Sequence, residues 1–339
     1  MKNYNRRKFI KTTAFSAAAF TSATTLSNCE NENLNPDSKG KYMGGFSAPK
    51  MESVRVAFIG LGARGSGHLK SIAKLEGVEV VAISDLFEDN VIRSLKVANE
   101  IGKGKRHNKI AQYWGEDNKW KLMLKEIKPD AVFISTNWNN HAPMAIHSME
   151  NGAHAFVEVP IAVTIEDMWK IVNTSEETQK HCMMMENVNY GRDELMYLNM
   201  CRKGVIGELL HAEAAYIHEL RFQMSQEERG TGSWRTHHYA NGKGNLYPTH
   251  GLGPVAQYMN LGRKDDTFKS LISYSSPALG RKLYAEKNYS SDHKWNQLDF
   301  QNGDINTSII KTNKGRTVMV QWDETSPRPY TLSLIHISE

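Results

Sequence analysis

The stretch from Val54 to Asp85, VRVAFIGLGARGSGHLKSIAKLEGVEVVAISD, decides the fold. It opens with an apolar run, which is typical of a strand buried on both faces. Three glycines follow in G-x-G-x-x-G spacing, namely Gly60, Gly62 and Gly65. Between a strand and a helix, the first glycine permits a tight turn. The second lets the backbone approach a pyrophosphate, and the third lets the helix pack close to the strand.

A second strand is predicted over residues 78–84, and it ends at Asp85, 20 residues after Gly65. A carboxylate there can accept hydrogen bonds from a ribose diol and would repel a 2′-phosphate, so NAD is favoured over NADP. The helix after the turn would direct its free N–H groups at the phosphates. The glycines alone could form an ordinary turn, but the two strands and the acidic residue in register favour dinucleotide binding.

The formal charge of +5 comes from the N-terminus. Residues 1–29 hold five basic residues and no acidic one, and removing these five from the 42 basic residues leaves as many as the 37 acidic ones. The basic pI therefore gives no indication of nucleic-acid binding. Arg6 and Arg7 precede a mildly apolar stretch that ends at Leu26. This pattern predicts a twin-arginine export signal in a bacterium, the alternative being a basic N-terminus by chance.

Cys29 ends the sequence LSNC, which resembles a lipoprotein cleavage box. It predicts a lipid anchor, the alternative being an ordinary cleavage site nearby. We therefore expect a periplasmic or outward-facing membrane-anchored protein that meets the twin-arginine export machinery. The composition of residues 30–53 predicts a flexible linker. Cys182 and Cys201 could pair, but their spacing indicates neither a metal site nor a disulfide framework.

Strands and helices continue to alternate up to residue 188, with strands expected at 130–136, 154–160 and 182–186. This order predicts an α/β fold, a Rossmann-type doubly wound parallel sheet over residues 54–188. Ligands bind beyond the carboxyl ends of such strands. The residues expected along that edge, besides the glycine turn and Asp85, are Trp138, Asn139, Asn140, His141, Glu158, Val159 and Asn187. Trp138 and His141 are predicted to contact nicotinamide or ribose, although such residues in a loop can also simply pack a helix start.

The pattern changes over residues 189–339, where an α+β domain with a largely antiparallel open sheet is expected. Alternation in HAEAAYIHE predicts a half-solvated strand over 209–218, and further strands are predicted at 271–275, 306–311 and 317–322. A helix is expected at 252–261. Residues 223–244 are polar, and we expect them to form a long functional loop.

Several motifs together resemble a known family. The E-x-P turn at Glu158 to Pro160 resembles that of the glucose–fructose oxidoreductase / inositol dehydrogenase / MocA superfamily. Its dehydrogenases place at the middle position a lysine that assists proton transfer, where this chain has Val159. The sequences GLGARGSGHL, NVNYGR and LYPTHGLGPVAQY resemble a narrower group, glycoside hydrolase family 109, the NAD-dependent α-N-acetylgalactosaminidases. Members of that group run on beyond the point where this chain stops, so we expect the chain to be C-terminally truncated.

The resemblance implies NAD as cofactor and a small-molecule glycoside as substrate. Matched residue by residue, it implies cofactor contacts from Arg64, Gly65, Asp85, Trp138, Asn139, Asn140, His141, Glu158, Val159 and Asn187. The glycine spacing itself predicts further cofactor contacts from Gly60 and Gly62. It implies substrate contacts from Tyr216, Arg235 and Tyr330. The segment Tyr247, Pro248, Thr249 and His250 would serve both cofactor and sugar.

The implied chemistry is a cycle of oxidation at C3, elimination, water addition and reduction, with the cofactor recycled. We expect Tyr247 and His250 to handle the protons, because a histidine titrates near neutral pH. His250 could instead be a structural residue at a helix start, Arg235 could lie in a solvated loop, and Tyr216 could be an ordinary residue of the sheet face. No metal site is expected. The alternatives for the whole chain are an exported sugar oxidoreductase and a non-catalytic sugar-binding lipoprotein. The aglycone and the oligomeric state are not indicated.

Overall fold

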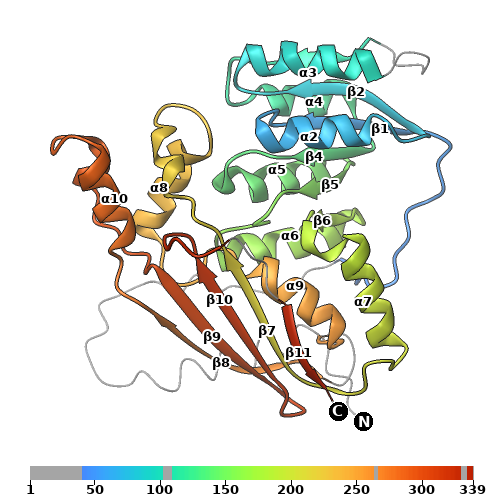
Figure 1. Cartoon of the computed structure of the whole chain (residues 1–339). Coiled ribbons are helices and arrows are strands. Elements are labelled where there is room, and N and C mark those ends of the chain that lie inside the picture. The colour runs from blue at the N-terminus through green and yellow to red at the C-terminus, as the bar shows by residue number, and fades with distance from the viewer. Residues whose placement is uncertain (1–39, 102–108, 263–265, 330–333, 339) are drawn as a thin grey trace, which may run out of the picture. The chain divides into compact units, whose positions relative to one another are not determined.

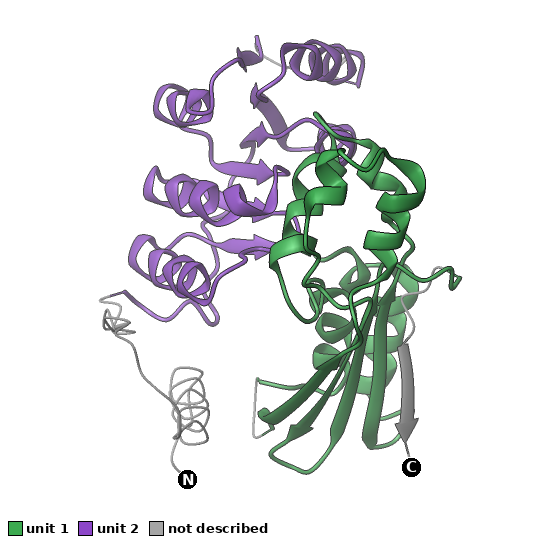
Figure 2. Ribbon diagram, turned by 90° about the vertical axis from the view of Figure 1, so that its left-hand side faces the viewer, with its two compact units in different colours: residues 1–30, 186–339 green, residues 31–185 purple. Residues whose placement is uncertain are grey.

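The computed structural model describes residues 40–101, 109–262, 266–329 and 334–338. They form two compact units, an N-terminal unit within residues 31–185 and a C-terminal unit over residues 186–339 (Figure 2). The division falls between Met185 and Glu186, whereas the sequence analysis placed it after residue 188. Residues 1–29, for which an export signal and a lipid anchor at Cys29 were predicted, and Tyr330 lie outside the described residues.

The N-terminal unit is built on a six-stranded parallel sheet in the order β3-β2-β1-β4-β5-β6 (Figure 1). This confirms the predicted doubly wound sheet, because the order reverses direction beside β1, where a dinucleotide-binding turn belongs. The strands are β1 (Val54–Ile59), β2 (Val78–Ser84), β3 (Ala111–Tyr113), β4 (Ala131–Ile134), β5 (His154–Val157) and β6 (Cys182–Met184).

Both faces of this sheet are buried under helices. Along β1, Ala57 and Ile59 enter one apolar core, and Val56 and Phe58 enter the other. Helices α2 (Ala63–Ile72) and α3 (Glu88–Ile101) cover the face of Phe58. Helices α4 (Lys119–Ile127), α5 (Trp138–Glu150) and α6 (Ile165–Thr178) cover the other face. A continuous apolar run, rather than strict alternation, is what such a strand requires.

Helix α5 begins earlier than predicted. We expected residues 137–141 to form a loop and the helix to start at Ala142, but the helix starts at Trp138. The reason is the cap, since the Asn137 side chain accepts a hydrogen bond from the backbone N–H of Asn140 at 3.1 Å. Asparagine is among the residues best suited to that position. The predicted contact residues from Trp138 to His141 therefore form the first turn of a helix.

The described part of the predicted linker is held against the N-terminal unit. The backbone N–H of Lys41 donates to the carbonyl of Glu176 at 3.1 Å, and the Gln179 amide donates to the carbonyl of Lys41 at 3.0 Å. The Phe46 ring lies 5.0 Å from that of His181, centre to centre. This segment has no helix or strand, but from Lys41 onward it is not the free tether that its composition predicted.

The C-terminal unit contains a five-stranded sheet in the order β11-β7-β10-β9-β8. Only the β7–β10 pairing is parallel, so the predicted largely antiparallel sheet is confirmed. The strands are β7 (Leu209–Ile217), β8 (Phe268–Ser275), β9 (Ile305–Thr312), β10 (Thr317–Asp323) and β11 (Leu334–Ser338). Helices α7 (Arg192–Arg202) and α9 (Thr249–Tyr258) share an apolar core with β7, β9 and β10 (Figure 1).

The prediction of a long loop at residues 223–244 is wrong, because most of this segment is helical. A 3₁₀ turn, η2, spans Arg221–Ser225, and helix α8 spans Thr231–Asn241. The buried residues of α8 are Gly232, Thr236, Tyr239 and Ala240, which repeat at helical spacing. Small and polar side chains fill most of that buried face, so a search for apolar periodicity could not detect it.

Other helices and strands differ less from the prediction or were not predicted. Helix α9 begins at Thr249 rather than at residue 252. The sequence analysis did not predict β11, α10 (Gly280–Asn288), or the 3₁₀ turns η1 (Asn187–Asn189) and η3 (Lys294–Gln297). Cys182 and Cys201 are both free, and burial raises the pKa of the Cys182 thiol to about 12. Among the described residues, no helix has the length and apolar character needed to cross a membrane.

Candidate active site

The glycine turn of the N-terminal unit has the shape of a phosphate cradle. Gly60 has a φ of +85°, a conformation that favours glycine, and a Cβ on it would lie 2.4 Å from the carbonyl oxygen of Ser135. A Cβ on Gly65 would lie 1.9 Å from the carbonyl oxygen of Gly60, so helix and strand can meet there only without a side chain. A Cβ on Gly62 would meet nothing within 4 Å. Two glycines thus build the turn, and the third leaves open space in front of the first turn of α2.

Asp85 follows β2 and is tied to this turn. One carboxylate oxygen accepts the backbone N–H of Leu61 at 2.6 Å. The other accepts the backbone N–H of Phe87 at 2.9 Å and the side-chain amide of Asn90 at 3.1 Å. The same carboxylate therefore fixes the turn between the first two glycines and the start of α3. Each carboxylate oxygen can accept more than one hydrogen bond, so a ribose diol could still be bound.

The first turn of α5 divides into buried and exposed residues. Trp138 and His141 are buried, whereas Asn139 and Asn140 are exposed. The ring nitrogens of His141 lie 2.7 Å from the carbonyl oxygen of Pro160 and 3.1 Å from that of Thr136. Burial lowers the pKa of His141, against the opposing effect of these two carbonyls. The His141 side chain thus links the chain after β4 to the chain after β5, and its contact with a cofactor stays a prediction.

Glu158 belongs to a charged cluster that sequence reasoning missed. Its carboxylate lies 2.6 Å from the Nε2 of His68, on α2, and 3.6 Å from the Nε of Arg64. Burial alone would raise the pKa of Glu158, but the hydrogen bond with His68 and the charge of Arg64 outweigh it and lower the pKa. His68 lies one helical turn after Arg64, at the i+4 spacing that puts two side chains on one helix face, and this spacing is the only signal that could have found it.

Val159 occupies the position of the dehydrogenase lysine and is buried, with 5% of its surface exposed. Its backbone N–H donates to the other carboxylate oxygen of Glu158 at 3.1 Å. The side chain itself offers no proton to transfer. The residues of the N-terminal unit therefore provide a dinucleotide site without the usual general base.

In the C-terminal unit, three of the predicted residues meet as stacked rings. The ring centres of Tyr216, on β7, and Tyr247 lie 5.2 Å apart, and His250, on α9, lies 4.9 Å from Tyr216 and 4.8 Å from Tyr247. The angles between the ring planes are 23°, 15° and 16°. All three side chains are almost fully buried. We call Tyr216, Tyr247 and His250 the ring cluster.

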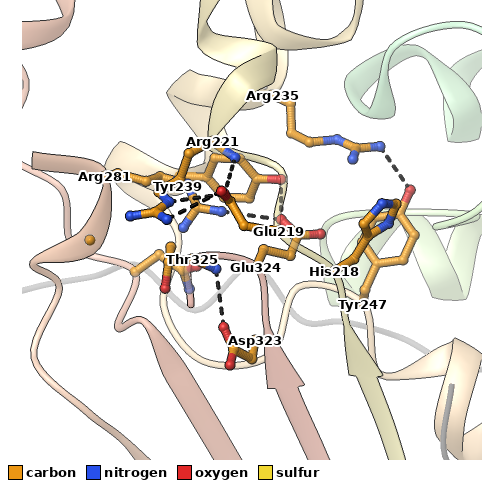
Figure 3. Close-up of polar contacts among 12 residues, drawn as sticks. His218, Glu219, Arg221, Arg235, Tyr239, Tyr247, Arg281, Asp323, Glu324 and Thr325 are labelled. Carbon is orange, nitrogen blue, oxygen red and sulfur yellow. Dashed lines mark hydrogen bonds and ion pairs between the residues drawn. The ribbon is translucent and has the colours of Figure 1, made fainter. Parts of the chain in front are cut away.

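Arg235 joins the ring cluster from α8. Its guanidinium donates to the hydroxyl of Tyr247 at 3.1 Å, as Figure 3 shows. The guanidinium carbon also lies 5.3 Å from the centre of the Tyr247 ring. The alternative of a solvated loop for Arg235 is therefore wrong, because the residue lies on a helix and contacts a second predicted site residue.

The ends of β7 and β10 supply further polar groups beside the cluster. Nδ1 of His218 lies 3.2 Å from the hydroxyl of Tyr216. Glu324 is fully buried, and its carboxylate accepts hydrogen bonds from Tyr239 and from Arg281, the latter at 3.2 Å (Figure 3). Burial, together with the charge of Glu324, raises the pKa of Tyr216 well above its ordinary value. Tyr216 therefore stays a neutral phenol near pH 7.

Glu186 is the second residue that sequence reasoning missed. Its buried carboxylate lies 2.8 Å from Nδ1 of His250. Asn187, the next residue, is exposed and begins η1, while Pro248 and Thr249 form the start of α9. The signal for Glu186 was weak, because an acidic residue after a short strand is common. Among the described residues, no group of three His, Cys, Asp or Glu side chains could hold a metal ion.

The fold and the glycine turn define a two-unit protein with an NAD-binding Rossmann domain. Residues 54–186 match the model of the oxidoreductase family with the NAD-binding Rossmann fold, and residues 190–336 match the C-terminal domain of glycosyl hydrolase 109. The scyllo-inositol dehydrogenase of Lactobacillus casei, solved with bound NAD(H) and scyllo-inositol, is similar with a TM-score of 0.60 at 14% identity, over 85% of this chain and 76% of that one. Such a likeness shows the fold alone.

Curated relatives are much more similar in sequence. Glycosyl hydrolase family 109 protein 1 of Akkermansia muciniphila is 64% identical over 87% of this chain. An alpha-N-acetylgalactosaminidase of Shewanella oneidensis is 54% identical over 98% of this chain. The chain spans 60% of the length of the first relative and 71% of the second. The chain belongs to glycosyl hydrolase family 109.

Proposed function

We propose that this chain has the activity of an NAD-dependent glycosidase that releases terminal α-N-acetylgalactosamine. The observation that carries the proposal is the ring cluster with Arg235, which brings Tyr216 of β7 and Arg235 of α8 to Tyr247 and His250. The relative from Shewanella oneidensis that is named for this activity supports the substrate class.

The residues of the N-terminal unit fit NAD. The open space in front of Gly62 leaves room for a pyrophosphate at the first turn of α2, whose N–H groups favour negative charge. When bound, NAD supplies a transient oxidation at C3 of the sugar, which acidifies the C2 hydrogen so that the C1–oxygen bond can break by elimination, and it leaves the cycle unchanged. Asp85 would accept hydrogen bonds from the ribose diol, and Arg64 is exposed beside Glu158.

The ring cluster would handle the protons. His250 carries a ring nitrogen that can accept a proton from the sugar. The hydroxyl of Tyr247 receives a hydrogen bond from Arg235, so its own hydrogen is directed away from the guanidinium. Arg235 has five N–H donors on a planar guanidinium, a group suited to bind a sugar hydroxyl or the acetamide oxygen. Tyr216, kept neutral, would donate or accept a hydrogen bond without adding charge.

A hydrolysis assay tests the proposal directly. The purified chain is incubated with p-nitrophenyl α-N-acetylgalactosaminide, with and without added NAD⁺, while phenol release and absorbance of reduced cofactor are followed together. We expect phenol release that depends on NAD⁺ and no net accumulation of NADH. Lasting accumulation of NADH would favour a sugar oxidoreductase instead. Measurable sugar affinity without either signal would favour a non-catalytic binding protein.

We further propose that the chain is exported by the twin-arginine route and anchored or released outside the cytoplasm. The support is the sequence alone, Arg6 and Arg7 before an apolar stretch and Cys29 at its end. A cofactor that is restored in every cycle suits a compartment without an NAD supply. The test is fractionation of bacterial cells expressing the chain. Export should fail when Arg6 and Arg7 are replaced by lysines, and Cys29→Ala should release any membrane-held protein.

A further inference from the structure

A buried carboxylate holds the histidine of the ring cluster. Oε1 of Glu186 lies 2.8 Å from Nδ1 of His250, and the exposed fractions of the two side chains are 1% and 7%. The same oxygen accepts the backbone N–H of Val188 at 3.0 Å. Glu186 is thus fixed from its own side by the first turn of η1, for which it serves as the N-cap. Glu186 therefore has one hydrogen bond that does not involve His250.

This contact determines which ring nitrogen of His250 carries the hydrogen. An ionised carboxylate only accepts hydrogen bonds, so Nδ1 must be the donor. In a neutral imidazole the other nitrogen, Nε2, then keeps its lone pair. The tautomer follows from the hydrogen-bond partner, as in other histidines whose second nitrogen is bonded to a carboxylate.

The plane of the ring is fixed independently. Tyr216 and Tyr247 stack against His250 with ring planes only 15° and 16° from parallel. Stacking limits rotation out of the plane, and the bond to Glu186 limits rotation within it. The imidazole therefore has one orientation before any substrate arrives, which is what proton transfer at a defined atom requires.

We propose that Glu186 is a positioning residue that holds His250 as the Nδ1–H tautomer, with Nε2 presented as the proton acceptor of the reaction. This rests on the proposed function, in which His250 moves a proton at the sugar. The buried carboxylate also stabilises the imidazolium that forms when Nε2 takes up the proton, because opposite charges interact strongly where water is excluded. The alternative is that Glu186 only caps η1.

The tautomer can be measured without any activity. The full chain is labelled with ¹⁵N-histidine, and the signal of His250 is identified among the 13 histidines by its loss in His250→Gln. When the ring is neutral, we expect a protonated Nδ1 and an unprotonated Nε2. In Glu186→Gln the amide can turn either its oxygen or its NH₂ group to the ring, so the Nδ1–H form should no longer be the sole one. A wild-type His250 protonated at Nε2 would overturn the proposal, even if the enzyme is active.

Measurements of enzymatic activity then distinguish a positioning role of Glu186 from a role as the N-cap of η1 alone. Glu186→Gln should lower kcat by about 10- to 100-fold and change KM by less than about threefold, as expected for loss of a partner that orients a reacting group. Glu176→Gln is the matched control, because Glu176 is also buried but lies on α6 of the other unit. Equal kcat values in the two variants would refute the proposal. If the wild type shows no turnover, the proposed function fails, and the tautomer measurement still decides the role of Glu186.

Discussion

The glycine turn of the N-terminal unit and the ring cluster of the C-terminal unit are built in opposite ways. The turn is a continuous segment in which missing side chains create the binding surface. The ring cluster and its partners Arg235 and Glu186 gather side chains from β7, α8, α9, the residue before η1 and the segment before α9, over a span from Glu186 to His250. A site formed by the backbone of one segment can be recognised from the spacing of its glycines in the sequence. A site made by side chains from distant elements leaves no spacing to find, and tertiary structure or a resemblance must locate it.

The largest expected effect is on turnover, at the ring cluster. His250→Gln should lower kcat by roughly 10²- to 10⁴-fold, the usual contribution of a positioned proton-transfer group. Cofactor affinity should fall far less, because the glycine turn is untouched. The measurement is the p-nitrophenyl glycoside assay together with calorimetric titration of NAD⁺. Equal losses of turnover and cofactor affinity would show that the two regions are not separable in this way.

The next effect is on folding, at the glycine turn. Gly65→Ala should lower the free energy of unfolding by about 3 kcal/mol, because its Cβ would overlap the carbonyl oxygen of Gly60. Gly62→Ala is the matched control. It should change stability by less than about 0.5 kcal/mol, since it meets nothing in the protein. It should nevertheless weaken NAD⁺ binding, because the methyl group fills the ligand's space. Denaturant unfolding and titration of NAD⁺ measure the two effects. A stable Gly65→Ala protein would contradict the assigned roles.

A third effect is on the stability of the C-terminal unit, at the turn that follows β10. Asp323, at the end of β10, accepts the backbone N–H groups of Thr325 and Ser326 and the Nε of Arg328. Burial would raise the pKa of its carboxyl, but a hydrogen bond from the Ser326 hydroxyl, the two backbone hydrogen bonds and the charge of Arg328 outweigh it and lower the pKa. The pKa of Asp323 in the folded protein lies below its unfolded value of about 3.9. The ionised carboxylate therefore contributes fully to folding stability well above pH 3.9, and this stabilisation is lost as pH falls through the folded pKa.

Asp323→Asn should therefore cost about 1–3 kcal/mol at pH 7, the range for a buried hydrogen-bonded charge. The difference from wild type should shrink at the lowest pH at which both proteins still fold. Thermal unfolding at several pH values measures it. A difference that does not change with pH would show that the carboxylate charge is not what holds this turn.

The smallest effect is expected at Arg235. Arg235→Lys keeps the charge but loses the forked donors, so a lysine cannot hold both Tyr247 and a sugar oxygen. We expect KM for the glycoside to rise about tenfold, equivalent to about 1.4 kcal/mol, with little change in cofactor affinity. Arg229→Lys, on the segment between η2 and α8, controls for a general effect of the substitution. An unchanged KM would remove Arg235 from the substrate site.

The sequence predicted the N-terminal unit well because each of its elements carries a local signal. Continuous apolar runs marked the buried strands, and the glycine spacing marked the turn. Helix α5 was placed too late because the capping role of Asn137 was not recognised. Helix α8 was missed because its buried face is made of small and polar residues such as Gly232 and Thr236.

The candidate site was predicted unevenly for the same reason. The resemblance supplied Tyr216, Arg235, Tyr247 and His250, and the structure shows that these four make contact. Neither composition nor spacing would have joined them. Glu186 and His68 act through contacts with residues 64 and 90 positions away in the chain, respectively. Pairings over such distances are set by the fold and leave no mark in either neighbourhood.

Val159 has a consequence for any attempt to turn this protein into a simple sugar dehydrogenase. A lysine there would place an ammonium group where a water-excluded isopropyl group now lies, and a buried charge without a counterion is costly. The nearest carboxylate along the chain, that of Glu158, already serves His68 and Arg64. A redesign would therefore need a new acidic neighbour along with the lysine. A Val159→Lys substitution alone is therefore not expected to produce a working dehydrogenase.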